Sequence, residues 1–153
     1  MSPDGDAPVG SPRRLRELLS WQANKVATLG SRLTLERMAA SARGDFAVLA
    51  ALAEIGDLSQ AEVGRRLGLD RNDVNEIATR LEHGGYVSRR PDERDRRLKV
   101  LSTTRDGQAY LARLQTQADE VQEELMTALT AAERAELIKL LGMVLNAYGP
   151  QSA

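Results

Sequence analysis

Two short helices joined by a glycine-centred turn are the feature that most limits how this chain can fold. Ser59 and Glu62 stand three residues apart in the pattern of a capping box, which opens a helix. Gly68 ends that helix, and Asp70 can cap a second one that runs to His83. Apolar residues at helical spacing predict its inner face: Val74, Ile77, Ala78 and Leu81. A tight helix-turn-helix unit is therefore predicted.

A β-hairpin is predicted directly after these helices. Residues 86–90 and 98–102 read as two strands, and the loop of residues 91–97 between them is strongly charged. The hairpin would project as a wing beside the second helix. The residues expected to face inward are Leu98, Val100 and, as an open alternative, Leu101.

Helices are also predicted on both sides of this unit. An amphipathic helix is expected over residues 13–30, ending at Gly30, and a buried helix over residues 45–55, ending at Gly56. A long helix begins at Thr104. A second capping box, Thr130 with Glu133, opens another that reaches Tyr148. Neither of these two can cover its apolar stripe within one chain, which predicts a homodimer.

The predicted fold is mainly α with a small β-hairpin wing: a winged helix-turn-helix flanked by N- and C-terminal dimerisation helices. At 153 residues the chain has the length of one domain. We expect a disordered lead-in over residues 1–12 and a single domain over 13–153. Within it, the winged helix-turn-helix covers 45–103 and the dimerisation helices cover 13–30 and 104–148.

Composition excludes several kinds of chemistry. The chain has no cysteine and one histidine, which argues against disulfides, thiol switches and metal sites, so neither a metal nor a cofactor is predicted. No apolar run approaches the roughly 20 residues of a membrane span, and residues 1–12 lack the features of a secretion signal; a cytoplasmic protein is expected. The net charge is −1, yet residues 59–103 hold ten basic and eight acidic side chains.

The second helix of the pair suits the major groove of DNA, where each base pair shows a distinct pattern of donors and acceptors. Arginine suits guanine, asparagine suits adenine, and a carboxylate can accept from cytosine. A merely solvated helix face is the alternative. The outward residues predicted to contact DNA are Arg71, Asn72, Asp73, Asn75, Glu76, Thr79 and Arg80, together with Ser59 and Gln60 at the start of the first helix.

Arginines at the tip of a projecting hairpin can enter the minor groove, where the negative potential is strongest. Arg94 and Arg96 are the candidates. A solvated loop is again the alternative.

These motifs together resemble the MarR family of bacterial regulators over about residues 13–148. The most specific parts are LSQAEVGRRLGL from Leu58, GYVSRR from Gly85, and the Asp95-x-Arg97 pattern in the wing. The resemblance implies a dimer that reads a near-palindromic DNA site, usually as a repressor. It implies that residues 70–83 form the recognition helix and that Asp95 and Arg97 form a structural pair shaping the wing.

The resemblance also implies release from DNA by a small aromatic or anionic compound. Trp21 and Phe46 could form an aromatic wall, and Arg16 and Arg43 an anion clamp. Alternatively, Trp21 anchors the dimer interface. Two other functions are weighed: a protein–protein interaction module built on the winged scaffold, and an enzyme. No convergent nucleophile and base supports the enzyme.

Overall fold

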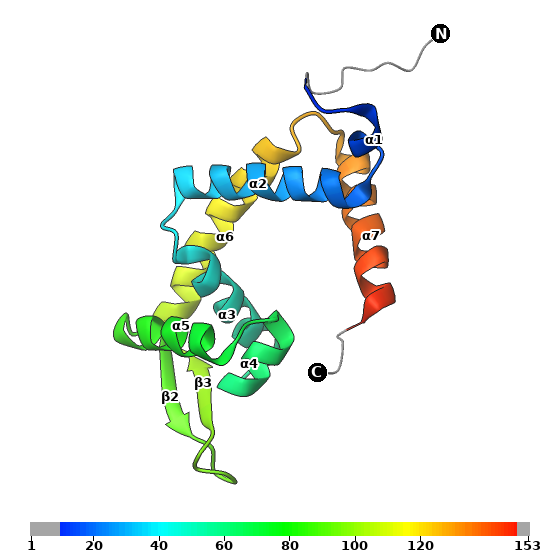
Figure 1. The fold of residues 1–153 in the computed structure, drawn as a ribbon. Coiled ribbons are helices and arrows are strands. Elements are labelled where there is room, and N and C mark those ends of the chain that lie inside the picture. Colours follow the sequence, from blue (N-terminus) through cyan, green and yellow to red (C-terminus); the bar gives the residue numbers. More distant parts are fainter. Residues whose placement is uncertain (1–9, 150–153) are drawn as a thin grey trace.

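The computed structural model describes residues 10–149, so most of the predicted lead-in over residues 1–12 lies outside the described residues. Helices dominate, and a small antiparallel sheet carries a hairpin that projects from one end (Figure 1). The predicted fold class is confirmed. Within residues 10–149, no helix combines the length and the apolar character needed to cross a membrane.

The helix-turn-helix pair forms as predicted, as helices α4 (Gln60–Leu67) and α5 (Arg71–His83). The hydroxyl of Ser59 accepts from the Glu62 amide at 3.1 Å, and the Asp70 carboxylate accepts from the Asp73 amide at 2.9 Å. Gly68 turns the chain in the left-handed region, at φ +65°. The reciprocal half of the first capping box is replaced, because the Glu62 carboxylate accepts hydrogen bonds from Arg65 and Arg66 instead.

Helix α3 (Ala42–Ile55) forms the centre of the core. It begins three residues before the predicted start and ends at Gly56, as predicted. Its buried side chains pack with the inner face of α5, which consists of the predicted residues. This packing fixes α5 with its opposite face open to solvent. The largest fully buried side chains of the cluster are Val48, Leu49, Val63, Val74, Leu81 and Leu101.

The sheet has three strands in the order β1-β3-β2: β1 (Leu58–Ser59), β2 (Val87–Pro91) and β3 (Lys99–Thr103). Each hairpin strand lies one residue later than predicted, and β1 was not predicted. Val100 and Leu101 are buried, whereas the inward prediction for Leu98 is wrong because this side chain is 41% exposed. Leu98 belongs to the loop closure, where its amide donates to the Asp95 carbonyl.

The predicted helix over residues 13–30 is wrong at both its middle and its end. A single turn, α1 (Arg13–Arg16), is separated by Glu17 and Leu18 from α2 (Leu19–Arg37). Helix α2 continues through Gly30 because the glycine faces α6 (Arg105–Leu125), and a Cβ there would lie 3.5 Å from Leu125. The glycine thus sits at a helix contact and does not end the helix.

Helix α6 begins directly against the base of the wing. The Thr104 amide donates to the Tyr86 carbonyl at 3.0 Å, and its hydroxyl donates to the Gly85 carbonyl at 2.7 Å. A Cβ on Gly107 would lie only 2.0 Å from the Tyr86 carbonyl oxygen, so this approach requires glycine. The start of α6 is therefore fixed to the end of the molecule that carries the wing.

The last helix, α7 (Ala131–Tyr148), opens with the predicted capping box of Thr130 and Glu133. Arg134 fixes the turn from α6, because its guanidinium donates to two carbonyls of that turn and to Glu123. Helix α7 lies apart from α3, α4 and α5 (Figure 1).

Candidate nucleic-acid interface

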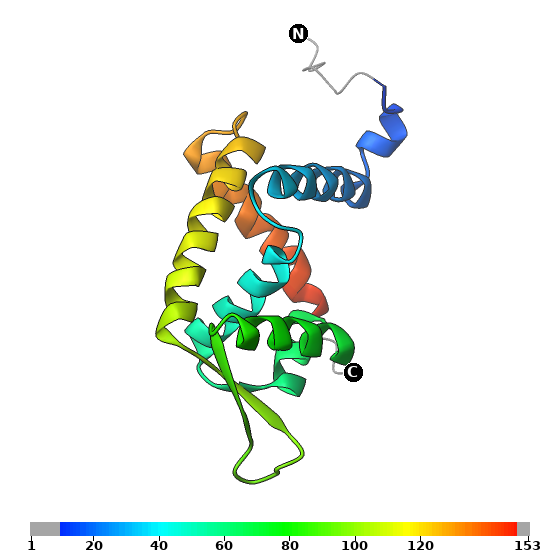
Figure 2. The ribbon, with the colours of Figure 1, turned by 90° about the vertical axis from the view of Figure 1, so that its left-hand side faces the viewer.

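The outer face of α5 is polar and open. Most of the residues predicted to contact DNA from this helix are exposed: Arg71, Asn72, Asp73, Asn75, Glu76 and Thr79. The wing projects beyond the end of the molecule where α5 lies, and Figure 2 shows its loop well clear of the helices. The two predicted reading elements thus lie at the same end of the fold.

Arg80 is placed differently from the prediction. Its Nε and Nη2 both donate to Oδ1 of Asp45, at 3.0 and 2.6 Å, and its side chain is 34% exposed. Arg80 therefore joins α5 to α3 within the protein, and its contact with a DNA base stays a prediction. The sequence pattern put it on the outer face because helical periodicity does not reveal a partner 35 residues away.

Asp45 is the centre of a buried polar junction that sequence reasoning missed. Its other oxygen, Oδ2, accepts from the Tyr110 hydroxyl at 3.0 Å, so one carboxylate links α3, α5 and α6. Burial, together with the hydrogen bond to Asp45, raises the pKa of Tyr110 to about 12. Tyr86 stacks on Tyr110 with ring centroids 4.3 Å apart. An acidic residue among the apolar positions of a buried helix was the available signal.

Arg89 of β2 is a second residue that sequence reasoning did not single out. Its Nη2 donates to the Thr79 hydroxyl at 2.9 Å, and its Nη1 donates to Oδ1 of Asn75 at 3.5 Å. The Glu82 carboxylate lies 3.9 Å from its Nε. Two predicted base readers on α5 are therefore already in contact with the wing strand.

The wing loop is held by its carboxylates and leaves its tip arginines open. Oδ1 of Asp92 accepts from the amides of Asp95 and Arg94, and these bonds lower the pKa of the Asp92 carboxyl. The Arg97 guanidinium pairs with Asp95 at 3.1 and 3.2 Å and, with the Arg97 amide, lowers the pKa of that carboxyl. Arg94 and Arg96 are exposed.

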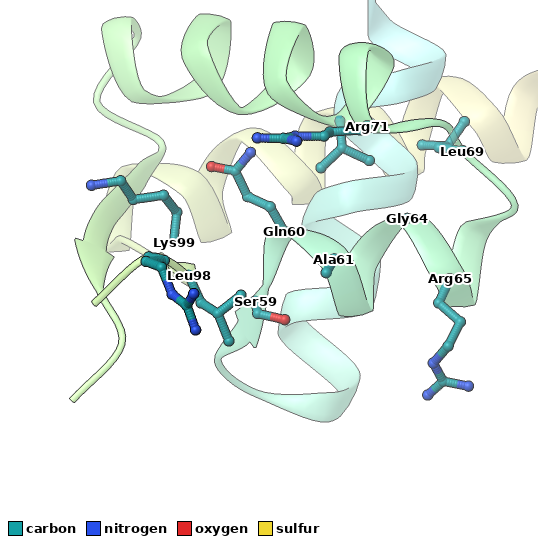
Figure 3. Close-up of a pocket in the computed structure, with 11 residues that line it drawn as sticks. Ser59, Gln60, Ala61, Gly64, Arg65, Leu69, Arg71, Leu98 and Lys99 are labelled. Atoms are coloured by element: carbon teal, nitrogen blue, oxygen red, sulfur yellow. The ribbon is translucent and has the colours of Figure 1, made fainter. Parts of the chain in front are cut away.

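A cleft of about 440 Å³ lies between the start of α4, the start of α5 and the first residue of β3 (Figure 3). It brings together Ser59, Gln60 and Arg71, three of the predicted DNA contacts. Lys99 of β3 also lines the cleft (Figure 3). The cleft thus gathers cationic groups and a helix N-terminus, the combination that binds phosphate oxygens. Its other lining residues include Arg65 and Arg97.

A separate cavity of about 340 Å³ lies between α2, α3 and α6. Arg43 and Phe46, two of the four predicted ligand contacts, line it together with apolar side chains. Arg16 and Trp21 are not among its lining residues, so the predicted four-residue site is not assembled within this chain. Trp21 instead contacts Lys25, whose Nζ lies 4.7 Å from the indole ring centroid. Arg43 donates to the Ser31 hydroxyl at 3.0 Å.

Comparison with known proteins gives consistent matches. A family model described as "MarR family" matches residues 41–98. The chain is 32% identical over 101 residues to the transcriptional repressor NicR of Pseudomonas putida, a match that covers 66% of this chain and 64% of NicR. It is 31% identical over 91 residues to the transcriptional regulator PapX of Escherichia coli, a match that covers 60% of this chain and 55% of PapX. The matched region thus spans 55% to 64% of the length of these two relatives, which are regulators and not enzymes.

Solved structures match over most of the chain. The PcaV regulator of Streptomyces coelicolor, in complex with its natural ligand, has a TM-score of 0.73 and 26% identity, covering 90% of this chain and 99% of PcaV. A cysteine-to-serine mutant of MarR from Escherichia coli, complexed with operator DNA, has a TM-score of 0.71 and 25% identity. The match covers 88% of this chain and 99% of that MarR chain. The winged helix-turn-helix, the matching family model and these relatives make the chain similar to the MarR family of transcriptional regulators.

Proposed function

We propose that two copies of this chain bind one pseudo-palindromic DNA site and repress transcription from it. The observation that carries the proposal is the shared orientation of two elements: the exposed polar face of α5 and the exposed arginines of the wing lie at one end of the fold. In this arrangement α5 enters the major groove while Arg94 and Arg96 reach the adjacent minor groove.

The remaining predicted contacts divide between bases and phosphates. Arg71, Asn72, Asp73 and Glu76 lie on the open part of α5 and read base edges. Ser59 and Gln60 lie in the cleft beside α4, where they and Lys99 meet the DNA backbone. The carboxylates at positions 73 and 76 would repel phosphates, so they serve to reject wrong sequences.

The second copy covers the apolar face of α7. This helix has no buried residue in the single chain, and its exposed apolar side chains follow helical spacing. Contiguous apolar surface of this kind marks an interaction site. Leu18, Leu19 and Val26 of the N-terminal region are also exposed and supply a complementary face. The α7 residues concerned are Leu137, Ile138, Leu140, Met143, Val144, Leu145 and Tyr148.

A small aromatic anion is the proposed effector. The cavity between α2, α3 and α6 has a volume suited to such a compound, with Phe46 for the ring and Arg43 for the negative charge. PcaV, a structurally similar regulator, has been solved in complex with its natural ligand.

The test is a footprint of the purified protein on the DNA upstream of its own gene. A dimeric reader protects two half-sites about one helical turn apart. In gel shifts on that DNA, the double variant Arg94→Ala with Arg96→Ala should bind far more weakly than the wild type. A matched control is Arg13→Ala with Arg14→Ala, which removes the same charge from exposed residues of α1 at the opposite end of the fold. Equal affinity of the wing variant and the control would contradict the proposal.

A further inference from the structure

Arg89 stands between the wing and the reading face of α5. Its side chain is only 17% exposed, although it carries a full charge. The two α5 residues that it contacts, Asn75 and Thr79, are one helical turn apart and are themselves exposed. Arg89 thus contacts the side of α5 that faces the wing, while the side that carries Asn72 and Glu76 is exposed to solvent.

The direction of these hydrogen bonds matters for base recognition. A guanidinium can only donate, so both Asn75 and Thr79 act as acceptors toward Arg89. The amide oxygen of Asn75 is thereby engaged, and its NH₂ group is left to meet a ligand. In the same way the Thr79 hydroxyl, accepting from Arg89, has its own proton left to donate.

An asparagine that reads adenine needs both halves of its amide, because the oxygen accepts from N6 while the nitrogen donates to N7. Arg89 takes one of the two lone pairs of the oxygen and turns the oxygen toward β2, so the NH₂ group is the half of the amide that stays fully free. A donor matches O6 and N7 of guanine or O4 of thymine, whereas adenine sets its N7 acceptor beside an N6 donor that would face the NH₂ group. We propose that Arg89 is a specificity-determining residue, which turns Asn75 and Thr79 into donors and so favours guanine or thymine over adenine at the base they face. This inference rests on the proposed DNA binding.

The position of Arg89 leaves one of its buried donors without a hydrogen bond within residues 10–149, which is energetically unfavourable. Its Nε is buried and makes no hydrogen bond within the described part of the chain, and the Glu82 carboxylate lies 3.9 Å away. The neighbouring Arg90 makes a useful contrast, because it points to solvent and pairs with Asp57 at 3.1 Å. The two arginines are adjacent on β2 and equal in charge, but only Arg89 touches the reading helix.

The experiment selects bound duplexes from a pool with a randomised segment and compares the base frequencies for four full-length proteins. The wild type gives the reference motif. Asn75→Ala identifies the position that Asn75 reads, as the one that loses discrimination. Arg89→Met removes the donors but keeps much of the apolar stem, and Arg90→Met is the matched control for the lost charge.

We expect the wild type to prefer guanine or thymine to adenine about tenfold at the position identified by Asn75→Ala, and Arg89→Met to reverse that preference there. Arg90→Met should keep the wild-type motif. An Arg89→Met motif equal to that of the wild type, with affinity reduced evenly, would overturn the inference. If Arg89→Met does not fold by circular dichroism, Arg89→Lys, whose single ammonium is a poorer match for two acceptors, is judged by the same comparison. A wild type that enriches no motif would instead overturn the proposed function.

Discussion

Arg80 on α5 donates two hydrogen bonds, of 3.0 and 2.6 Å, to one oxygen of Asp45, which lies 35 residues earlier on α3 and is only 3% exposed. The second oxygen of the same carboxylate holds Tyr110 on α6. A buried charge is tolerated when it is paired and its remaining acceptor is satisfied, as here. The orientation of α5 relative to the core is thus tied to one side chain.

Asp45→Ala should lower the free energy of unfolding by about 3 kcal/mol, because Arg80 and Tyr110, both partly buried, lose a shared acceptor. Urea denaturation at fixed protein concentration measures this. Asp57→Ala is the control, since its pair with Arg90 is about half exposed and its loss should cost less than about 1 kcal/mol. Similar losses for the two variants would show that the junction does not stabilise the fold.

The stability of the protein should also fall at high pH through Tyr110. Its folded-state pKa is raised to about 12 from the ordinary value of 10.0, so the folded state favours the protonated phenol. The resulting stabilisation is fully present below about pH 10 and is lost as the pH rises toward 12. Stability of the wild type and of Tyr110→Phe, measured by urea denaturation between about pH 8 and 12, should converge above about pH 10. A constant difference across that range would contradict the assignment.

Loss of the wing arginines should change how DNA binding depends on salt. Each contact between a cation and a phosphate contributes about one unit to the slope of log affinity against log salt concentration. Because each dimer carries two wings, Arg94→Ala with Arg96→Ala removes four cations from the complex and should reduce that slope by about four. Fluorescence anisotropy at several salt concentrations gives the slope. An unchanged slope would remove these residues from the interface.

The glycine at the start of α6 should not tolerate a side chain. Gly107→Ala places a methyl group 2.0 Å from the Tyr86 carbonyl oxygen, and we expect a loss of more than about 2 kcal/mol in unfolding free energy. Gly30→Ala is the control: its Cβ would make an ordinary 3.5 Å contact inside a helix, which should be neutral or stabilising by up to about 1 kcal/mol. Thermal unfolding of both variants distinguishes the two cases. A Gly107→Ala protein as stable as the control would disprove the close contact.

Binding of a small aromatic anion should depend on Arg43 and not on Trp21. Arg43→Ala removes the positive charge at the cavity and should weaken binding of benzoate or hydroxybenzoates about tenfold or more. Trp21→Phe should leave the affinity for these compounds unchanged, because Trp21 does not line the cavity of its own chain. Isothermal titration calorimetry measures both. Binding that is lost with Trp21→Phe and kept with Arg43→Ala would relocate the site.

The local features of the fold could be predicted from the sequence because their causes are local. Caps at Ser59, Asp70 and Thr130 depend on residues three positions apart, and the inner face of α5 depends on helical periodicity. The polar character of the outer face follows from the same pattern. These elements were therefore placed to within a few residues.

Features set by distant contacts could not be predicted in the same way. Gly30 looked like a helix end, but its role depends on Leu125, 95 residues later. Strand β1 has two residues and exists because Leu58 and Ser59 pair with Leu101 and Val100. The sequence marks Arg80 and Arg89 only as basic residues. It does not reveal their partners, Asp45 on α3 and Thr79 on α5.

The contact between Gly107 and Tyr86 has a consequence for any attempt to dissect this protein into modules. The first turn of α6 donates to and packs on the backbone at Gly85 and Tyr86, the same two residues that lead from the recognition helix into the wing. A fragment cut after Thr103 would leave those carbonyls without their partners, and a graft of the wing onto another helix would need a glycine at the same place. At this point of the described chain no boundary separates α5 and the wing from α6. These elements must therefore be exchanged together.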